Sequence, residues 1–388
     1  MEKTSPAGGP ARFPGLAFLG RVDAKRARIA AALGLVWAVL VSLFHFGGFF
    51  DGAEERLLDW ETTWIASGPA PADRDAYALL SIDRVPSDRP WPWPRLDYAI
   101  LLHGLLPQHP RSVVFEMLMH DEDPRYTAFD DTFASLVRRC GTGAAVFAAA
   151  ALQTDAKTPP PEGALGLILS GKREKGVLPN RYASLFWPVV TFSAGAPVGV
   201  TNLGPDADGV VRRIPLVFPV REKLLPSLAL AAAASRLGAD LAKSEAKLGR
   251  RGGEVILRDA DGKALRRIPV DASGAMRLRA RSPGLPVARI GNDAFVLAAD
   301  QAEGGRPLDP PVPLASFAGR QVWIGATDPT VAKPLLTPSG LRAPVEVAMA
   351  ASAQIVRSDF LHPVPKPVAS LLFLVTGGVL AYAARRFH

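Results

Sequence analysis

Cysteine and the residue patterns of common catalytic sites are scarce in this sequence. Cys140 is the single cysteine, so no disulfide can form within the chain. None of the six histidines stands in an HExxH pattern or in a paired Cys/His set, and the P-loop and GxSxG patterns are missing as well. The sequence therefore predicts a protein that is not an enzyme, with no catalytic residue, no metal site and no cofactor.

Charge is absent from two apolar stretches, one near each end of the chain. Residues 29–50 and residues 368–384 contain no Lys, Arg, Asp or Glu. As helices with a rise of 1.5 Å per residue, they would extend about 33 Å and about 26 Å, against a hydrocarbon core of roughly 30 Å. The pattern predicts transmembrane helices over 29–50 and 367–384. The alternatives are a cleaved signal peptide for the first stretch and a buried core helix for the second.

Basic residues lie just outside both apolar stretches and predict the topology. They are Arg21, Lys25, Arg26 and Arg28 before the first stretch, and Arg385 and Arg386 after the second. By the positive-inside rule, the basic and partly disordered leader 1–28 and the end 385–388 are cytoplasmic, and residues 51–366 lie outside. Much of the net charge of +8 belongs to the two ends, since residues 51–366 hold 37 basic and 35 acidic residues. This distribution argues against a nucleic-acid partner.

The region 51–366 has the pattern of one α/β domain. Apolar runs that suit buried strands alternate with helical patterns, which predicts a Rossmann-like, mainly parallel sheet. The predicted strands are 76–83, 111–119, 144–151 and 321–326, and the predicted helices between the first three are 96–109 and 130–143.

The segment 197–290 has a different pattern and predicts an antiparallel, hairpin-rich insertion. The sequence DADG occurs at 206–209 and again at 259–262, each time between two alternating apolar runs, which is typical of a hairpin. A helix is predicted between them, over 225–242.

Acidic residues fall at the ends of three predicted strands: Asp83, Glu116 and Asp328. Open parallel sheets bind ligands at the carboxyl ends of their strands, so we expect these three side chains to share a ligand site. Gathered carboxylates raise one another's pKa unless a cation accompanies them, and Arg95 is a candidate for that cation. The alternative is that each acid caps the loop after its own strand.

Two tryptophans alternate with prolines just before a predicted helix. Trp91 and Trp93 have the composition of an aromatic cage for a cationic ligand, and we include them in the candidate site. Proline-spaced tryptophans also clamp a loop onto a sheet and start the next helix, which is the alternative. Asp206 and Asp208 have the spacing of calcium ligands, but the later ligands of a calcium loop are missing, so a turn is predicted there.

Several segments of this chain, taken in order, resemble the CHASE2 domain, an extracellular sensory module of bacterial signalling proteins. They are LLDW at 57–60, LLSID at 79–83, RPWPWPR at 89–95, VVFEMLM at 113–119, D-x-x-F-A at 130–134, NLGPDADGVVRRIPL at 202–216, LPSLALAAA at 225–233 and the segment 322–365. The resemblance covers roughly residues 51–366. The chain departs from the family at Glu116, where an Asp is usual, and at Pro344, where a Gly often opens the helix.

The resemblance implies an extracytoplasmic sensor, held in the bacterial inner membrane, with most of the chain in the periplasm. Family members usually continue into a kinase or a nucleotide enzyme, and this chain stops at His388, so we expect signalling through a separate effector. The expected partners are the lipid bilayer, a membrane protein or effector, and a second copy of the chain. The alternatives are a structural scaffold subunit of a membrane or envelope complex, and a metal-dependent hydrolase built on the carboxylate cluster.

Overall fold

A computed structural model of the chain describes most of its residues and divides them into two compact units. The described residues are 24–65, 76–88, 91–121, 127–154, 166, 168–170, 177–178, 182–220, 223–279, 287–306, 311–361 and 366–386. One unit is Met1–Leu58 with Pro363–His388, and the other, called here the sheet unit, is Asp59–His362. The expected leader before Ala24 lies outside the described residues.

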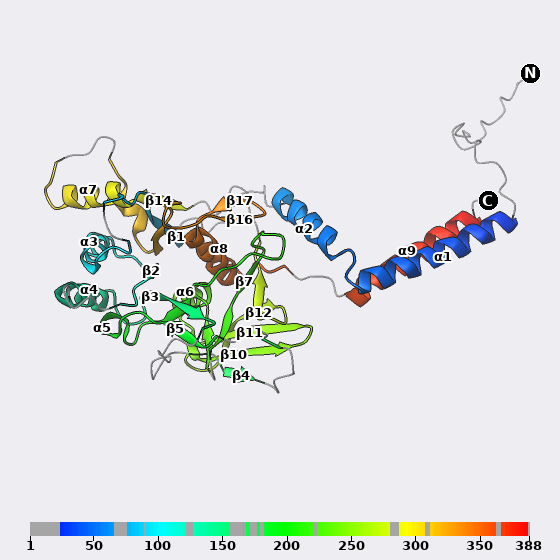
Figure 1. Ribbon diagram of the computed structural model, residues 1–388, viewed down its shortest axis with the longest axis horizontal. Helices are drawn as coiled ribbons and strands as arrows, with labels where there is room; N and C mark the ends of the chain where they lie inside the picture. The colour runs from blue at the N-terminus through cyan, green and yellow to red at the C-terminus, as the bar shows by residue number, and fades with distance from the viewer. Residues whose placement is uncertain are drawn as a thin grey trace, which may run out of the picture. The chain divides into compact units, whose positions relative to one another are not determined.

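A mainly parallel sheet forms the centre of the sheet unit (Figure 1). Its strands run in the order β14-β1-β15-β2-β3, and both β5 and β6 pair with β3, β5 antiparallel and β6 parallel. The strands are β1 (Tyr77–Ile82), β2 (Ser112–Leu118), β3 (Ala145–Leu152), β5 (Ser184–Phe186), β6 (Val198–Val200), β14 (Ala288–Gly291) and β15 (Gln321–Ala326). The predicted parallel sheet is confirmed, with the strand at 321–326 inserted between the first two.

Helices cover both faces of this sheet and bury two separate apolar cores. One face packs on α3 (Arg95–Leu105), α4 (Thr127–Arg139), α5 (Val190–Ser193) and α7 (Asn292–Ala302), and the other on α6 (Leu228–Leu237) and α8 (Pro344–Arg357). Alternate strand residues enter alternate cores: Phe115 and Ile324 face the α3–α4 layer, whereas Val114 and Trp323 face the α6–α8 layer. The strands have continuous apolar sequences because helices cover both faces of the sheet.

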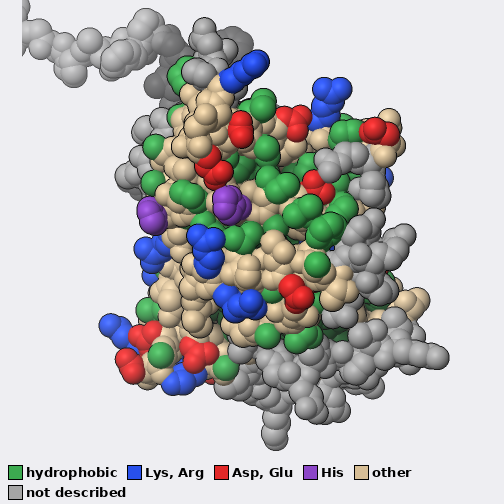
Figure 2. All heavy atoms as spheres, turned by 90° about the vertical axis from the view of Figure 1, so that its left-hand side faces the viewer, with side chains coloured by type: hydrophobic (Ala, Val, Ile, Leu, Met, Phe, Trp, Pro, Cys, Tyr) green, Lys and Arg blue, Asp and Glu red, His purple; other side chains and the backbone are tan. Residues whose placement is uncertain are grey.

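The face that carries α3, α4 and α7 shows hydrophobic side chains among scattered charges (Figure 2). Four large apolar residues of α3 and α7 are exposed in the sheet unit: Leu96, Ile100, Val296 and Leu297. The two helices approach closely because Gly104 has no side chain; a Cβ there would lie 2.7 Å from Ala299 Cβ.

Smaller sheets lie beside the main one, and most of their strands come from the hairpin-rich segment 197–290. A four-stranded sheet has the order β12-β11-β10-β4, and three two-stranded ribbons accompany it. The strands are β4 (Ile168–Ser170), β7 (Arg213–Pro215), β8 (Val217–Val220), β9 (Lys223–Pro226), β10 (Asp240–Gly249), β11 (Gly252–Arg258), β12 (Ala264–Val270), β13 (Ala275–Arg277), β16 (Leu335–Thr337) and β17 (Gly340–Arg342).

The structure confirms one of the two predicted DADG hairpins and corrects the other. The turn at 259–262 joins β11 to β12 antiparallel, as expected. At 206–209 the turn forms, but the strand before it, β6, joins the main sheet, and β7 after it pairs with β13. The predicted helix at 225–242 is also shorter, because α6 ends before Gly238, which has a φ of +70°, and β10 follows.

The other unit contains α1 (Ala24–Phe46), α9 (Lys366–Arg386) and the first part of α2 (Asp51–Ile65). Helices α1 and α9 pack along each other. A Cβ at Gly377 would lie 3.0 Å from Ala38 Cβ, and the Ser42 hydroxyl lies 3.5 Å from the Ser370 carbonyl oxygen. Small residues therefore form this contact, as they do between transmembrane helices.

No single described helix has both the length and the apolar composition of a membrane span. Ala32–Phe46 and Asp51–Glu61, bent by 84° at the break between them, have them as a pair.

Candidate functional site

The carboxyl ends of β1, β15 and β2 lie side by side and carry a row of residues on the α8 face. Ser81 of β1 is paired with Gly325 of β15. A Cβ at Gly325 would lie 3.2 Å from Glu116 Oε2 of β2 and 2.5 Å from Val345 Cγ2 of α8. The missing side chain at Gly325 thus makes room for Val345 and places Glu116 beside the start of α8.

Glu116 is a largely buried acid whose ionised form is disfavoured. Its Oε1 accepts a hydrogen bond of 3.3 Å from the Thr201 hydroxyl. Burial raises the pKa of Glu116 to about 8, and the hydrogen bond from Thr201 offsets only part of that effect. The carboxyl group is therefore mainly protonated at neutral pH and offers both a donor and an acceptor.

Arg289 of β14 joins three elements at the same edge of the sheet. Its Nε lies 3.3 Å from Ser81 Oγ and its Nη2 lies 3.0 Å from Thr327 Oγ1. Its Nη1 lies 3.3 Å from Glu346 Oε1, and Glu346 Oε2 accepts from the Ala343 backbone N–H at 2.9 Å. We name the whole set the carboxyl-edge cluster: Ser81, Glu116, Thr201, Arg289, Thr327 and Glu346.

Asp328, one of the three predicted acids, organises loops. Its side chain accepts from the Val85 backbone N–H at 2.7 Å and from the Thr330 backbone N–H and hydroxyl at 2.9 and 2.7 Å. The bonds from Thr330 and then from Val85 lower the pKa of Asp328. Asp328 thus ties the loop after β15 to the loop after β1, which is the capping role kept as the alternative.

Asp83 lies beyond the end of β1 and is exposed. Its carboxylate lies against Gly291, the residue just before α7, where a side chain at position 291 would collide with it. Glu116, in contrast, is enclosed against α8. The three predicted acids are therefore at neighbouring strand ends, but their carboxyl groups do not share one surface.

Arg95, Trp91 and Trp93 lie on the opposite face of the sheet from Glu116, so the expected wall of the site is wrong. Arg95 Nη2 donates to the Asp121 carbonyl at 2.9 Å, and its Nε lies 3.4 Å from Asp130 Oδ1 of α4. Trp93 is buried in the α3–α4 core, 5.8 Å from the ring of Trp91. These contacts fix the loop before α3. Strand alternation directs the acid of β2 to the other face of the sheet, away from them.

Comparison with protein families shows the family to which the chain belongs. A model of the CHASE2 domain matches residues 34–383, nearly the whole sequence. The chain belongs to the CHASE2 family. CHASE2 domains are extracytoplasmic sensory domains of signalling proteins. No curated protein and no solved structure gives a significant match to the chain.

The CHASE2 segment 202–216 builds a second polar feature, an ion-pair network around Arg212. Arg212 is 4% exposed; its Nε lies 2.7 Å from Asp59 Oδ2 of α2, and its Nη1 lies 2.8 Å from Asp208 Oδ1. Asp206 pairs with Arg213 at 2.7 Å. The hydrogen bond from Arg212 holds the pKa of Asp208 at about 2. The two acids of the first DADG turn thus bind arginines, which agrees with the turn predicted there.

Two ion pairs from one short segment hold both ends of the CHASE2 sheet unit. Arg277 Nη2 lies 3.7 Å from Oδ1 of Asp59, the first residue of the unit. Arg279, two residues further on, forms an ion pair with Asp359, near the last residue. The chain therefore enters and leaves the sheet unit beside one short segment.

Sequence reasoning did not find most of the carboxyl-edge cluster. Arg289 belongs to β14, a four-residue strand too short to give a clear pattern. Glu346 lies two residues after Pro344, where the chain departs from the CHASE2 pattern, and was not singled out; Ser81 and Thr201 are common residues in strands and loops. Among the described residues, no group of three or more His, Cys, Asp or Glu side chains has an arrangement that could hold a metal ion.

Proposed function

We propose that this CHASE2 chain is a membrane-anchored sensory domain that acts in bacterial signal transduction through a separate effector and catalyses no reaction itself. In this proposal α1 and α9 span the inner membrane, and residues 51–366 lie in the periplasm. The observation that carries the proposal is the family match over residues 34–383. The basic residues outside both apolar stretches support the orientation.

The surface of the α1–α9 pair supports membrane anchoring. Its large apolar side chains point outward instead of into a common core, which suits lipid and not water. Those exposed are, on α1, Ile29, Leu33, Leu35, Val36, Trp37, Val39, Leu40, Leu43, Phe44 and Phe46 and, on α9, Val368, Leu371, Leu372, Phe373, Val375 and Val379.

The carboxyl-edge cluster is the proposed sensory site. It lies where open parallel sheets bind ligands, and it combines a protonated acid with an arginine and hydroxyl groups. Binding there of a small polar molecule would draw on Glu116 as a donor and on the partly exposed Arg289 as a cation. Asp83 stands at the neighbouring strand end, outside the cluster.

Protease treatment of spheroplasts tests the topology. Protease added outside should remove the region 51–366 and leave the two ends protected, whereas lysed cells should lose the ends as well. Protection of the whole chain, or release of a soluble domain that lacks residues 1–50, contradicts the proposal.

A scaffold subunit of an envelope complex is the second candidate, favoured by the exposed apolar residues of α3 and α7 (Figure 2). Leu96, Ile100 and Leu297 provide a surface for another protein. The neighbouring reading frame separates the two candidates: a signalling effector supports the sensor, and an assembly subunit supports the scaffold.

A further inference from the structure

Helix α2 leaves the first apolar helix at a steep angle. The stretch Asp51–Glu61 is bent by 84° from Ala32–Phe46. Gly48 permits the bend, because its φ of +82° lies in the left-handed region and its carbonyl accepts from the Asp51 backbone N–H at 3.2 Å. Membrane helices tilt by roughly 20° on average from the bilayer normal. With α1 crossing the bilayer as proposed above, α2 therefore runs close to the membrane plane.

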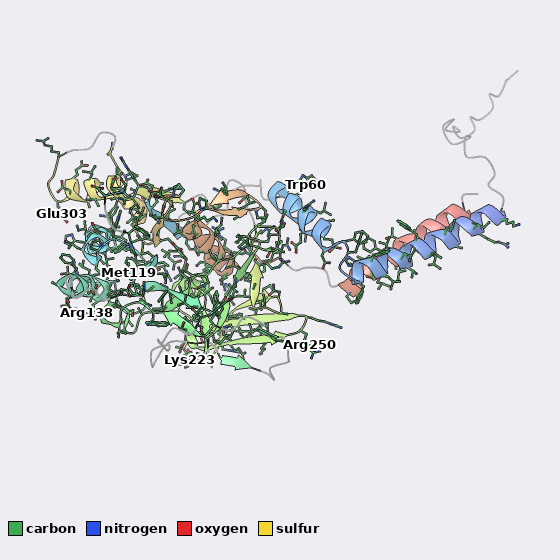
Figure 3. All side chains as sticks on the ribbon, in the orientation of Figure 1. Trp60, Met119, Arg138, Lys223, Arg250 and Glu303 are labelled. Carbon is green, nitrogen blue, oxygen red and sulfur yellow. The ribbon has the colours of Figure 1, made fainter. Side chains whose placement is uncertain are left out.

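The two faces of α2 differ in character. Successive residues of a helix are about 100° apart, so Ala53, Leu57 and Trp60 share one stripe, and Glu55 and Asp59 lie on the opposite side. Leu57 is 62% exposed and Trp60 is 61% exposed. Trp60 is labelled on α2 in Figure 3. The acidic side is engaged, since Asp59 binds Arg212. The apolar stripe is thus exposed, whereas Asp59 on the opposite side of the helix is paired with Arg212.

Aromatic residues continue this stripe to the end of α1. Phe49, at the bend, is 74% exposed, and its ring centroid lies 5.4 Å from that of Phe44 and 5.3 Å from that of Phe50. The apolar surface of α1 therefore continues through Phe49 onto α2. Aromatic rings of this kind gather at the level of the lipid headgroups, where one side is apolar and the other is wet.

We propose that α2 is an interfacial helix, embedded along its length in the outer headgroup region of the bilayer through Phe49, Leu57 and Trp60. The inference rests on the proposed membrane anchoring. Lipid is the occupant because the stripe is continuous with the lipid-facing surface of α1 and lies at right angles to it. One helix then contacts lipid on one side and Arg212 on the other.

Nitroxide depth measurements on the full chain in lipid nanodiscs test this placement. In a Cys140→Ser background, single cysteines are introduced at Leu57 or Trp60, and spin-labelled. Gly52→Cys is the matched control on the same helix, because a Cβ at Gly52 meets no atom within 4 Å and lies off the stripe. Labels at 57 and 60 should collide with a water-soluble nickel chelate at least about threefold less than the label at 52, and more with oxygen.

The outcomes separate the helix placement from the anchoring. Alkaline carbonate extraction of proteoliposomes should leave the chain in the lipid fraction. If the chain stays there but the labels at 57 and 60 are as accessible to nickel as the label at 52, the interfacial helix is wrong and the anchoring stands. If carbonate extracts the chain, the anchoring fails and the placement of α2 fails with it. Protection of 57 and 60 that persists in lipid-free amphipol indicates a protein contact and also overturns the inference.

Discussion

Glu116 shows how a single enclosed carboxyl group makes stability depend on pH. Its pKa is raised to about 8 in the folded protein, whereas a glutamate in an unfolded chain titrates near about 4.3. Between these two values the folded state keeps a proton that the unfolded state has lost. Stability therefore falls as the pH rises from about 5 to about 8, and the loss is complete above that range.

Glu116→Gln should remove this dependence. The amide keeps the shape and the hydrogen bond to Thr201 without an ionisable group, so we expect the variant to exceed the natural chain by several kcal/mol, at most about 5 kcal/mol, at pH 9 and to match it at pH 4. Denaturant unfolding of the full chain in detergent measures the difference. Asp131→Asn, at an exposed carboxyl group of α4, is the control and should change little at either pH. Equal pH profiles for Glu116→Gln and the natural chain would show that Glu116 is ionised in the folded state.

Gly325 is the second residue whose role is local and testable. Gly325→Ala would place a methyl group 2.5 Å from Val345 Cγ2, so α8 or Glu116 must shift. We expect a loss of about 1–3 kcal/mol of unfolding free energy, typical of an overpacked core. Gly204→Ala, where a Cβ meets no atom within 4 Å, should leave the melting temperature almost unchanged. Similar melting temperatures for both variants would argue against the close packing at Gly325.

At the scale of elements, α1 and α9 approach closely at Gly377 but not at its neighbour Gly378. A Cβ at Gly377 would lie 3.0 Å from Ala38 Cβ, whereas a Cβ at Gly378 would meet no atom within 4 Å. Gly377→Leu should therefore separate the helices and abolish a disulfide cross-link engineered between them, and Gly378→Leu should retain it. Equal cross-linking of the two variants would contradict the helix contact. As a control, the sheet unit should remain resistant to protease in both variants, which would show that it is still folded.

The attachment of α2 to the sheet unit depends on Asp59. Asp59→Asn removes the charge that Arg212 and Arg277 share, and leaves a buried guanidinium with a weaker partner. We expect a loss of about 1–3 kcal/mol and faster hydrogen exchange in α2. Exchange in β15, inside the main sheet, serves as the internal reference. Unchanged exchange in α2 would mean that other contacts hold the helix.

The elements that the sequence predicted well are those buried on both sides. Tyr77–Ile82 and Gln321–Ala326 are continuous apolar runs, and both are strands of the parallel sheet. The first DADG turn was wrongly predicted to join a hairpin because its local pattern suits one. The strand before the turn, β6, pairs instead with β3, which is distant in sequence. Glu116 was placed at the right strand end, but its face depends on strand alternation, and Arg289 belongs to a strand of only four residues.

At the scale of the whole molecule, the ends of the sheet unit are neighbours. Asp59 and Asp359 bind Arg277 and Arg279, which are two residues apart. The folded unit therefore replaces a loop of roughly 320 residues between Phe46 and Lys366 with two short tethers, about 20 residues in all.

This closure couples the folding of the sheet unit to the association of the two terminal helices. Closing a flexible loop of 320 residues costs about 5 kcal/mol of chain entropy, about half of which the folded unit has already contributed. When the sheet unit unfolds in detergent, the effective concentration of one helix for the other falls by about sixtyfold, because it decreases with tether length to the power −3/2. The α1–α9 association then reports on the sheet unit from within the same chain. The fraction of associated helices, measured with one label on each helix, falls when the sheet unit unfolds.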